Sequence, residues 1–168
     1  MIFKFCPKCG GKLEKIKQED HCRLSCSDCH FIFYRNAKPT VGALIIDEQD
    51  RVLLAERGLD PKKGFWDLPG GFLEEDEDPE DGLKRELQEE LGVEIKIDKM
   101  LGIFVDKHQD ENDDCFTLNI HYLAKIIQGE PKAMSDVSAF RWFKEEDLPL
   151  DKMAFKHNEK VIKSWLKK

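Results

Sequence analysis

The chain has 168 residues, of which 40% are apolar, and its formal net charge is −7 at pH 7. This length allows one ordinary domain with a small appendage, and the apolar content is sufficient for a packed core. No apolar run approaches the roughly 18 residues needed to cross a bilayer, so we expect no membrane-spanning segment and no membrane partner.

Two CxxC pairs stand near the start of the chain: Cys6 with Cys9, and Cys26 with Cys29. Their separation is typical of a zinc ribbon, in which four thiolates close a tetrahedral Zn²⁺ site and leave no position for water. About 35 residues bury little core, so the metal would supply the folding energy. The sequence therefore predicts a structural zinc site.

Two disulfides are the alternative use of these four cysteines. Residues 1–5 are too short for the apolar core of a secretory signal, so we expect a cytoplasmic protein and free thiols. The nearby His21, Cys22 and His30 are interpreted as bystanders. Cys115 is expected to be a small buried residue of a strand.

The chain is divided by sequence into a zinc ribbon (1–35), a linker (36–39) and a larger domain (40–168). Residues 1–38 carry eight Lys or Arg and four Asp or Glu, and the remainder carries a net charge of −11. Once a Zn(Cys)₄ site is counted as −2, the ribbon is only weakly basic. Nucleic acid is therefore not expected as a partner.

The larger domain alternates β-strand patterns with helical ones. A hairpin is expected from two aliphatic runs, and two alternating strands are expected on either side of an acidic loop at 106–114. A short strand surrounds Phe140 and Trp142, and apolar residues at helical spacing predict a C-terminal helix. The predicted segments are Thr40–Ile46, Arg51–Ala55, Glu94–Val105, Cys115–Ile127 and Asn158–Lys168.

One short predicted helix contains most of the candidate metal-ligating residues. Asp78 is a natural N-cap, Pro79 suits the first helical position, and Gly92 is placed to end the helix, which predicts a span of Pro79–Leu91. At about 100° per residue, its three leucines share one stripe that can dock on a sheet, and three glutamates cluster on the neighbouring stripe. The two sets are Leu83, Leu87 and Leu91, and Glu86, Glu89 and Glu90.

Three carboxylates this close repel one another unless a cation lies among them. Hard oxygen ligands of this kind suit Mg²⁺ or Mn²⁺, which commonly share coordination with substrate phosphates. Arg85, one turn before Glu89, can orient that carboxylate. The alternative for any such stretch is a solvated acidic face. The metal hypothesis requires the oxygens of the three glutamates to converge beside the glycine turn.

The spacing around this helix resembles the Nudix box at every specified position of residues 71–93. Gly71 is followed after five residues by Glu77, then after seven by Arg85-Glu86-Leu87, and finally by Glu89-Glu90 and Gly92-Val93. The GFWDLPGG stretch at 64–71 and the Arg141-Trp142-Phe143 stretch also resemble the family. The resemblance covers about residues 39–150.

The resemblance implies an α/β fold, namely an α/β/α sandwich with a mixed sheet, here preceded by a small zinc ribbon. It implies a hydrolase that cleaves a nucleoside diphosphate linked to another group. By position, Glu86, Glu89 and Glu90 would be metal ligands, the Gly71 carbonyl a further ligand, and Glu77 a residue that steadies the site.

The general base is left open between Glu86 and an acid of the later loop. Family members use either a glutamate of the box or a carboxylate from a later loop. In this chain the loop at 106–114 offers several acids, and Glu86 is favoured over them. These acids are Asp110, Glu111, Asp113 and Asp114.

The substrate is less determined than the reaction. A zinc ribbon ahead of such a domain resembles the NADH pyrophosphatases, but no SQPW-type array lies between residues 94 and 114. The proline and tyrosine typical of other subgroups are absent from this interval as well. The leading hypothesis is an Mg²⁺-dependent diphosphatase acting on ADP-ribose or a related nucleotide sugar or dinucleotide such as NADH. The alternatives are a nucleotide-sensing or RNA-binding module that uses the ribbon, and a house-cleaning nucleoside triphosphate pyrophosphatase. The sequence leaves the oligomeric state open, with a homodimer as one option.

Overall fold

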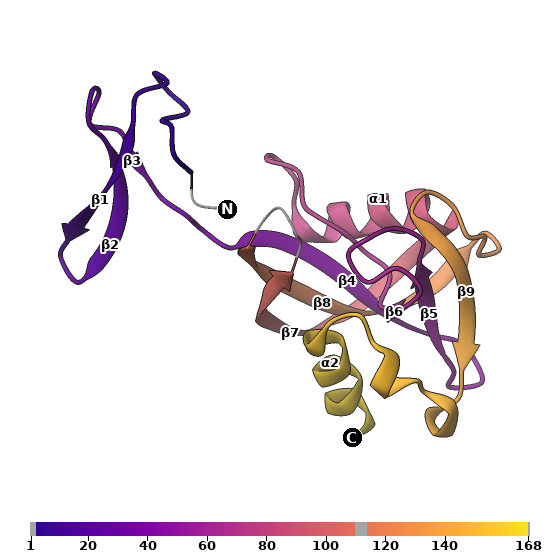
Figure 1. Cartoon of the computed structure of the whole chain (residues 1–168). Coiled ribbons are helices and arrows are strands. Elements are labelled where there is room, and N and C mark those ends of the chain that lie inside the picture. Colours follow the sequence, from indigo (N-terminus) through magenta and orange to yellow (C-terminus); the bar gives the residue numbers. More distant parts are fainter. Residues whose placement is uncertain (1–2, 110–113, 168) are drawn as a thin grey trace. The chain divides into compact units, whose positions relative to one another are not determined.

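The computed structural model describes residues 3–109 and 114–167. The chain divides into two compact units, Met1–Asn36 and Ala37–Lys168 (Figure 1). Each unit has its own sheet and its own core. Within the described residues, no helix is long and apolar enough to cross a membrane.

The first unit is a three-stranded antiparallel sheet in the order β1-β2-β3. Its buried apolar core consists of Cys6, Leu13 and Cys26. A core this small cannot by itself offset the conformational entropy that about 35 residues lose on folding. The strands are β1 (Leu13–Gln18), β2 (His21–Cys26) and β3 (Ile32–Phe33).

The second unit is built on a six-stranded mixed sheet. Five strands follow the order β6-β5-β4-β8-β7, and β9 pairs with β5. The pairing of β4 with β8 is parallel, whereas the other strand pairs are antiparallel. The strands are β4 (Lys38–Ile46), β5 (Val52–Arg57), β6 (Trp66–Asp67), β7 (Glu94–Gln109), β8 (Asp114–Gln128) and β9 (Val137–Phe143).

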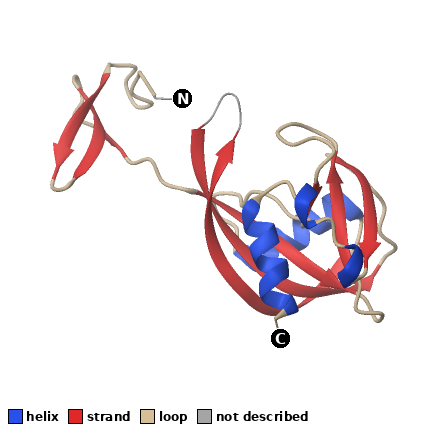
Figure 2. Cartoon of the chain, turned by 60° about the horizontal axis from the view of Figure 1, so that its bottom comes forward, coloured by secondary structure: helices blue, strands red, loops and turns tan. Residues whose placement is uncertain are grey.

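Two helices cover opposite faces of this sheet (Figures 1 and 2). Because side chains of a strand alternate between its faces, Ala43 packs with Leu87 of one helix, and Leu44 packs with Val161 of the other. The unit is therefore an α/β/α sandwich, as expected. Its helices are α1 (Pro79–Leu91) and α2 (Lys156–Leu166), and two short 3₁₀ turns, Glu145–Asp147 and Leu150–Lys152, lie before α2.

Helix α1 has the bounds that its local signals predict. Pro79 is the first helical residue, and Gly92 ends the helix in the left-handed conformation with φ +67°. The Gly92 N–H donates to the Gln88 carbonyl at 3.0 Å. Asp78 occupies the N-cap position, but its side chain makes no capping hydrogen bond.

The hairpin of β7 and β8 is longer than the sequence pattern indicates (Figure 2). Polar residues after Val105 continue β7 because backbone pairing with β8 does not require apolar side chains. Asp106 therefore lies in a strand, which corrects its assignment to an acidic loop. β4 likewise begins at Lys38, inside the segment expected to be linker.

Candidate active site

The turn after β6 brings the backbone close to helix α1. Gly70 has φ +142°, and a Cβ there would lie 2.2 Å from the Val41 carbonyl oxygen, so only glycine fits. A Cβ on Gly71 would lie 2.5 Å from the carboxylate of Glu86. The Gly71 carbonyl accepts a hydrogen bond from the Val41 N–H at 2.9 Å, and a carbonyl has a second lone pair. Glu86 therefore lies directly against the backbone of the turn.

Arg85 joins the acids of the box to one another. Its Nε and Nη2 donate to the two oxygens of Glu77 at 2.8 and 2.9 Å, and its Nη1 donates to Glu86 at 2.8 Å and to Glu89 at 3.4 Å. Nη2 also donates to the Phe72 carbonyl at 3.1 Å. These hydrogen bonds raise the pKa of Arg85 and lower the pKa of Glu77. The sequence pointed to Glu89 as the partner of Arg85, but the two-pronged contact is with Glu77.

Glu90 is the buried acid of the site. Its side chain is 8% exposed, and its Oε2 accepts a hydrogen bond from the Gly70 N–H at 2.9 Å. Burial raises the pKa of Glu90 to about 9, the Gly70 hydrogen bond opposes this shift, and the charges of Asp136 and Asp67 add to it. Burial likewise raises the pKa of Glu86, to which Asp136 also contributes. Burial thus disfavours the ionised form of both carboxyls, although Arg85 partly offsets the charge of Glu86.

The three glutamates point in two directions. Glu86 and Glu90 lie against the Gly70–Gly71 turn, whereas the Glu89 side chain is 56% exposed and contacts Arg85. Among the described residues, only a cysteine cluster brings three or more such ligand atoms within 4.8 Å of one another. The glutamate oxygens are therefore not gathered at one point in this arrangement, and the Arg85 guanidinium bridges Glu86 and Glu89 and partly offsets their charge.

Asp136 is a further acid of the site that the sequence analysis did not single out. Its charge raises the pKa values of both Glu86 and Glu90. The backbone fixes its position, because the Gly58 N–H donates to the Asp136 carbonyl at 2.6 Å and the Met134 N–H donates to the Glu90 carbonyl at 2.9 Å. The segment before β9 thereby places a carboxylate beside the box helix.

The structure does not test most of the rivals of Glu86 as general base. Of the acids proposed in the later loop, Asp110, Glu111 and Asp113 lie outside the described residues, as does the side chain of Asp114. Asp106 is described, and its Oδ2 is 3.2 Å from Nδ1 of His157. Asp106 is thus engaged with α2, whereas Asp136 is a described acid whose charge acts on both Glu86 and Glu90.

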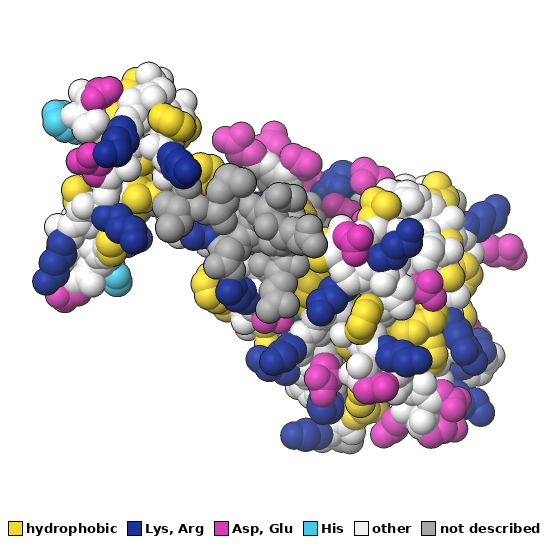
Figure 3. Space-filling view, in the orientation of Figure 1, with side chains coloured by type: hydrophobic (Ala, Val, Ile, Leu, Met, Phe, Trp, Pro, Cys, Tyr) yellow, Lys and Arg dark blue, Asp and Glu magenta, His cyan; other side chains and the backbone are white. Residues whose placement is uncertain are grey.

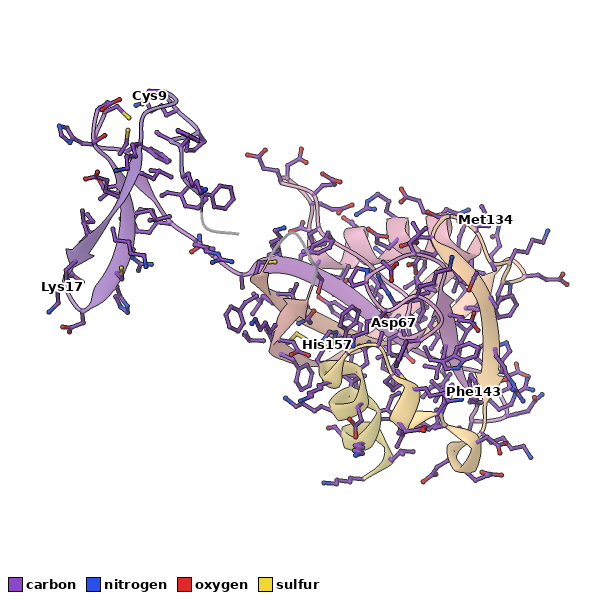
Figure 4. All side chains as sticks on the ribbon, in the orientation of Figure 1. Cys9, Lys17, Asp67, Met134, Phe143 and His157 are labelled. Atoms are coloured by element: carbon purple, nitrogen blue, oxygen red, sulfur yellow. The ribbon has the colours of Figure 1, made fainter. Side chains whose placement is uncertain are left out.

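A cavity of about 150 Å³ opens beside the glycine turn. It lies between β4, β8 and the start of α2, and Figure 4 shows two of its residues, Asp67 and His157. Asp67 accepts hydrogen bonds from Arg57, at 3.1 Å, and from Asn158, yet burial still raises its pKa to about 6. The cavity reaches from Gly70 and Gly71 to the rings of His121 and His157.

The acids near the turn fit a divalent cation. Glu86 and Glu90 are hard oxygen donors with raised pKa values, and Asp136 adds a third negative charge beside them. A bound cation would stabilise the ionised forms that burial disfavours. Exposed acids, among them Glu74, Glu75 and Asp76, gather over the loop that precedes α1 (Figure 3), and such a surface raises the local concentration of cations.

The four cysteines of the first unit form a separate metal centre. All four Sγ atoms lie within 4.8 Å of one another, with separations of 3.4 Å for Cys9–Cys26 and Cys9–Cys29 and 3.7 Å for Cys6–Cys29. Tetrahedral Zn–S bonds of about 2.3 Å require sulfur separations of about 3.8 Å. The four thiols are therefore positioned to hold a metal ion. All four are free cysteines and do not form disulfides. Cys22 is exposed and lies outside the cluster.

Models of known protein families match both parts of the chain. A model described as "NUDIX domain" matches residues 36–165, and one described as "Nudix N-terminal" matches residues 4–35. The chain belongs to the Nudix family. A Nudix hydrolase from Nitrosomonas europaea has the same architecture, with a TM-score of 0.82 and 27% identity over 98% of this chain and 91% of that one.

Two curated relatives illustrate the range of this Nudix hydrolase family. The ADP-ribose pyrophosphatase of Methanocaldococcus jannaschii is 35% identical over 123 residues, which cover 73% of this chain and 70% of the relative. The NAD-capped RNA hydrolase NudC of Vibrio vulnificus is 26% identical over 149 residues, which cover 87% of this chain and 52% of the relative. The chain is thus a Nudix hydrolase with an N-terminal cysteine ribbon.

Proposed function

We propose that this Nudix hydrolase is an Mg²⁺- or Mn²⁺-dependent diphosphatase that cleaves nucleoside diphosphate derivatives, with ADP-ribose as the first substrate to test. The observation that carries the proposal is the contact of Glu86 and Glu90 with the Gly70–Gly71 turn, beside Asp136. The choice of ADP-ribose rests on the archaeal relative, which shares 35% identity over most of its length.

The roles of the box residues follow from their contacts. Glu86, Glu89 and Glu90, with the Gly71 carbonyl, would hold the cation, which when bound supplies charge neutralisation of the diphosphate and an acidified water. Arg85 is a positioning residue, because its guanidinium fixes the carboxylates of Glu77 and Glu86. The glycines at the turn let the Val41 carbonyl and the Glu86 carboxylate lie directly against the backbone.

Hydrolysis needs a group that accepts a proton from the attacking water. Glu86 remains the favoured base, and Asp136 is its rival because it lies beside the same carboxylates. The water oxygen bonds to one phosphorus while the bond from that phosphorus to the bridging oxygen breaks. The electron pair of that bond remains on the leaving phosphate. With ADP-ribose, the products would be AMP and ribose 5-phosphate.

The four-cysteine ribbon is proposed to hold structural zinc. Its sulfur separations match tetrahedral Zn–S geometry, and its own apolar core is very small. Because a closed four-thiolate site leaves no open position, this metal is assigned no part in hydrolysis.

A substrate panel with product analysis tests the proposal. The full-length chain is incubated with Mg²⁺ and ADP-ribose, NADH, a nucleotide sugar, NAD-capped RNA or deoxynucleoside triphosphates, and the products are separated by chromatography. The proposal would be supported if the chain releases two monophosphates from ADP-ribose and if this activity is lost in Glu86→Gln but kept in Glu80→Gln. Glu80 is a matched control because it is exposed on the same helix. Release of pyrophosphate from the triphosphates alone would favour the house-cleaning alternative.

Capped RNA is the second candidate substrate. The specific observation is the NudC relative, whose match to 87% of this chain extends into the ribbon. In the panel, preference for NAD-capped RNA over free NADH would favour this candidate. Equal rates on both would indicate that only the dinucleotide is recognised.

A further inference from the structure

Two buried residues beside the proposed catalytic turn have polar atoms without a partner. Among the described residues, the only buried side-chain nitrogen and oxygen atoms that lack a hydrogen bond are Nδ1 and Nε2 of His121 and Oδ1 of Asn158. His121 is 3% exposed and Asn158 is 1% exposed. Both residues line the cavity that opens at Gly70 and Gly71. Because buried polar groups are nearly always hydrogen-bonded, these atoms point to a missing ligand.

A second polar residue of β8 shows that a buried polar side chain in this sheet can have all of its hydrogen bonds. Asn119, two residues before His121 on β8, accepts from Thr40 at 2.7 Å and donates to Thr117 at 3.0 Å and to the Phe104 carbonyl at 3.1 Å. All of its polar atoms are therefore paired. His121 differs because its ring lies over Gly42 of β4, with which it is in register. A Cβ on Gly42 would be only 2.7 Å from the ring, so the glycine makes room for the imidazole.

The wall around His121 is aromatic. The rings of Phe155 and His157 are stacked at 5.6 Å, His157 and His121 are 5.2 Å apart, and His121 and Phe104 are 6.0 Å apart. Burial lowers the pKa of His121 to about 3, so this imidazole is neutral at pH 7 and offers one donor and one acceptor. An aromatic wall of this kind suits a planar heterocycle, and a ring nitrogen of His121 can bond a polar atom on its edge.

The charges that line the cavity disfavour a phosphate at this end. Arg57 is paired with Asp67 and Asp106 is paired with His157, so neither pair offers a net positive charge to a phosphate beside His121. At the glycine turn, a cation held by Glu86 and Glu90 would offset the charge of the diphosphate, so the diphosphate is better placed there.

We propose that this cavity holds the purine base of the substrate and that His121 is a specificity-determining residue that hydrogen-bonds the base edge. The inference rests on the proposed diphosphatase function for its substrate class. The buried Asn158 oxygen supplies a second acceptor in the same cavity. The base thus pairs with one ring nitrogen of His121 and with the Asn158 oxygen, and the diphosphate extends toward Gly70 and Glu90.

Binding is tested first without turnover. The full-length chain, labelled with ¹⁵N-histidine, is titrated with AMP, GMP or ribose 5-phosphate in the absence of Mg²⁺, and the His121 resonances are assigned by their loss in His121→Phe. We expect AMP or GMP to shift the His121 ring nitrogens at concentrations where ribose 5-phosphate does not. If neither purine nucleotide shifts them, or if ribose 5-phosphate shifts them equally, the assignment is overturned.

Specificity is tested with a substrate whose base edge is blocked. In 1,N⁶-etheno-ADP-ribose the donor–acceptor edge of adenine is closed, so the wild type should prefer ADP-ribose by about tenfold or more in kcat/KM. His121→Phe keeps a ring over Gly42 and should lose this preference through a raised KM, with kcat nearly unchanged. His121→Gln, which retains a donor and an acceptor, should recover part of it. Lys125→Ala, an exposed change on the same strand, is the control.

The outcomes separate this inference from the proposed function. If purine nucleotides shift His121 but no diphosphate is hydrolysed, the diphosphatase proposal fails and the base site stands. Thermal melting first checks that both His121 variants are folded. If ADP-ribose is hydrolysed and both variants keep the wild-type preference, only the base-site proposal fails.

Discussion

The guanidinium of Arg85 meets the carboxylate of Glu77 through two parallel hydrogen bonds, of 2.8 and 2.9 Å. Glu77 lies in the loop before α1 and Arg85 lies within the helix, so this pair fixes the loop to the helix. The same guanidinium also reaches Glu86 and Glu89. One side chain therefore sets the orientation of three carboxylates, which explains why the box needs an arginine at this position.

Replacing Arg85 by lysine should weaken metal use without unfolding the domain. A lysine is a point charge that cannot contact both oxygens of Glu77 while bridging Glu86 and Glu89. We expect kcat/KM to fall by about 10–100-fold and the half-saturating Mg²⁺ concentration to rise. Steady-state kinetics across a Mg²⁺ series measures both. Lys84→Arg is the control, since Lys84 pairs with Asp81 on the exposed side of the helix. An Arg85→Lys enzyme with unchanged kinetics would contradict the positioning role.

Glu90 should make the stability of the magnesium-free protein depend on pH. Its folded pKa is raised from an ordinary 4.5 to about 9. Between these values the folded state holds a proton that the unfolded state has released, so stability falls as pH rises through this range.

Glu90→Gln removes the ionisable group and should flatten this dependence. We expect the Tm difference between variant and wild type to grow by a few degrees from pH 6 to pH 9. Added Mg²⁺ should raise the wild-type Tm more at pH 9 than at pH 6, because it binds the ionised form. Thermal melts without chelator, which leave the ribbon metal in place, provide the measurement, with Glu80→Gln as the control. Parallel Tm curves for all three proteins would show that Glu90 titrates normally.

Helix α1 and the cysteine cluster were accessible to sequence analysis because their signals are local. Pro79 and Gly92 mark the ends of α1, and the CxxC spacing brings Cys6 and Cys26 to one point. Asp136 was missed because its position depends on the pairing of β5 with β9, which no local pattern encodes. The extension of β7 beyond Val105 was missed for the same reason, since β8 supplies the pairing.

His121 shows most clearly what one sequence cannot disclose. The alternating pattern around it predicts a strand. However, the residue paired with His121 is Gly42, 79 positions earlier, on a parallel strand. Only this pairing reveals that a glycine provides the space for the imidazole, whose nitrogens have no hydrogen-bond partner among the described residues. A histidine on a strand is otherwise indistinguishable from an ordinary buried polar residue.

Asp136→Asn should discriminate between the two candidate bases. If Asp136 accepts the proton of the attacking water, the substitution should lower kcat by about 10²–10⁴-fold with little change in KM. If Glu86 is the base, Glu86→Gln should show that loss and Asp136→Asn a much smaller one. The pH–rate profiles of both variants decide the matter, because removing the base abolishes the acidic limb. Asp151→Asn, an exposed change outside the site, should leave kcat and KM unchanged.

The cysteine cluster should be required for the fold of the first unit but not of the second. Its buried core contains Cys6 and Cys26 themselves, whereas the second unit has large cores on both faces of its sheet. Cys26→Ser should therefore release about one equivalent of zinc and expose Met1–Asn36 to proteolysis, because metal binding supplies the folding free energy of so small a unit. The main thermal transition should move by only a degree or two. Metal analysis and limited proteolysis measure the two effects, and Cys22→Ser, an exposed cysteine outside the cluster, should retain the metal. Full zinc content in Cys26→Ser would mean that the four thiols do not act as one site.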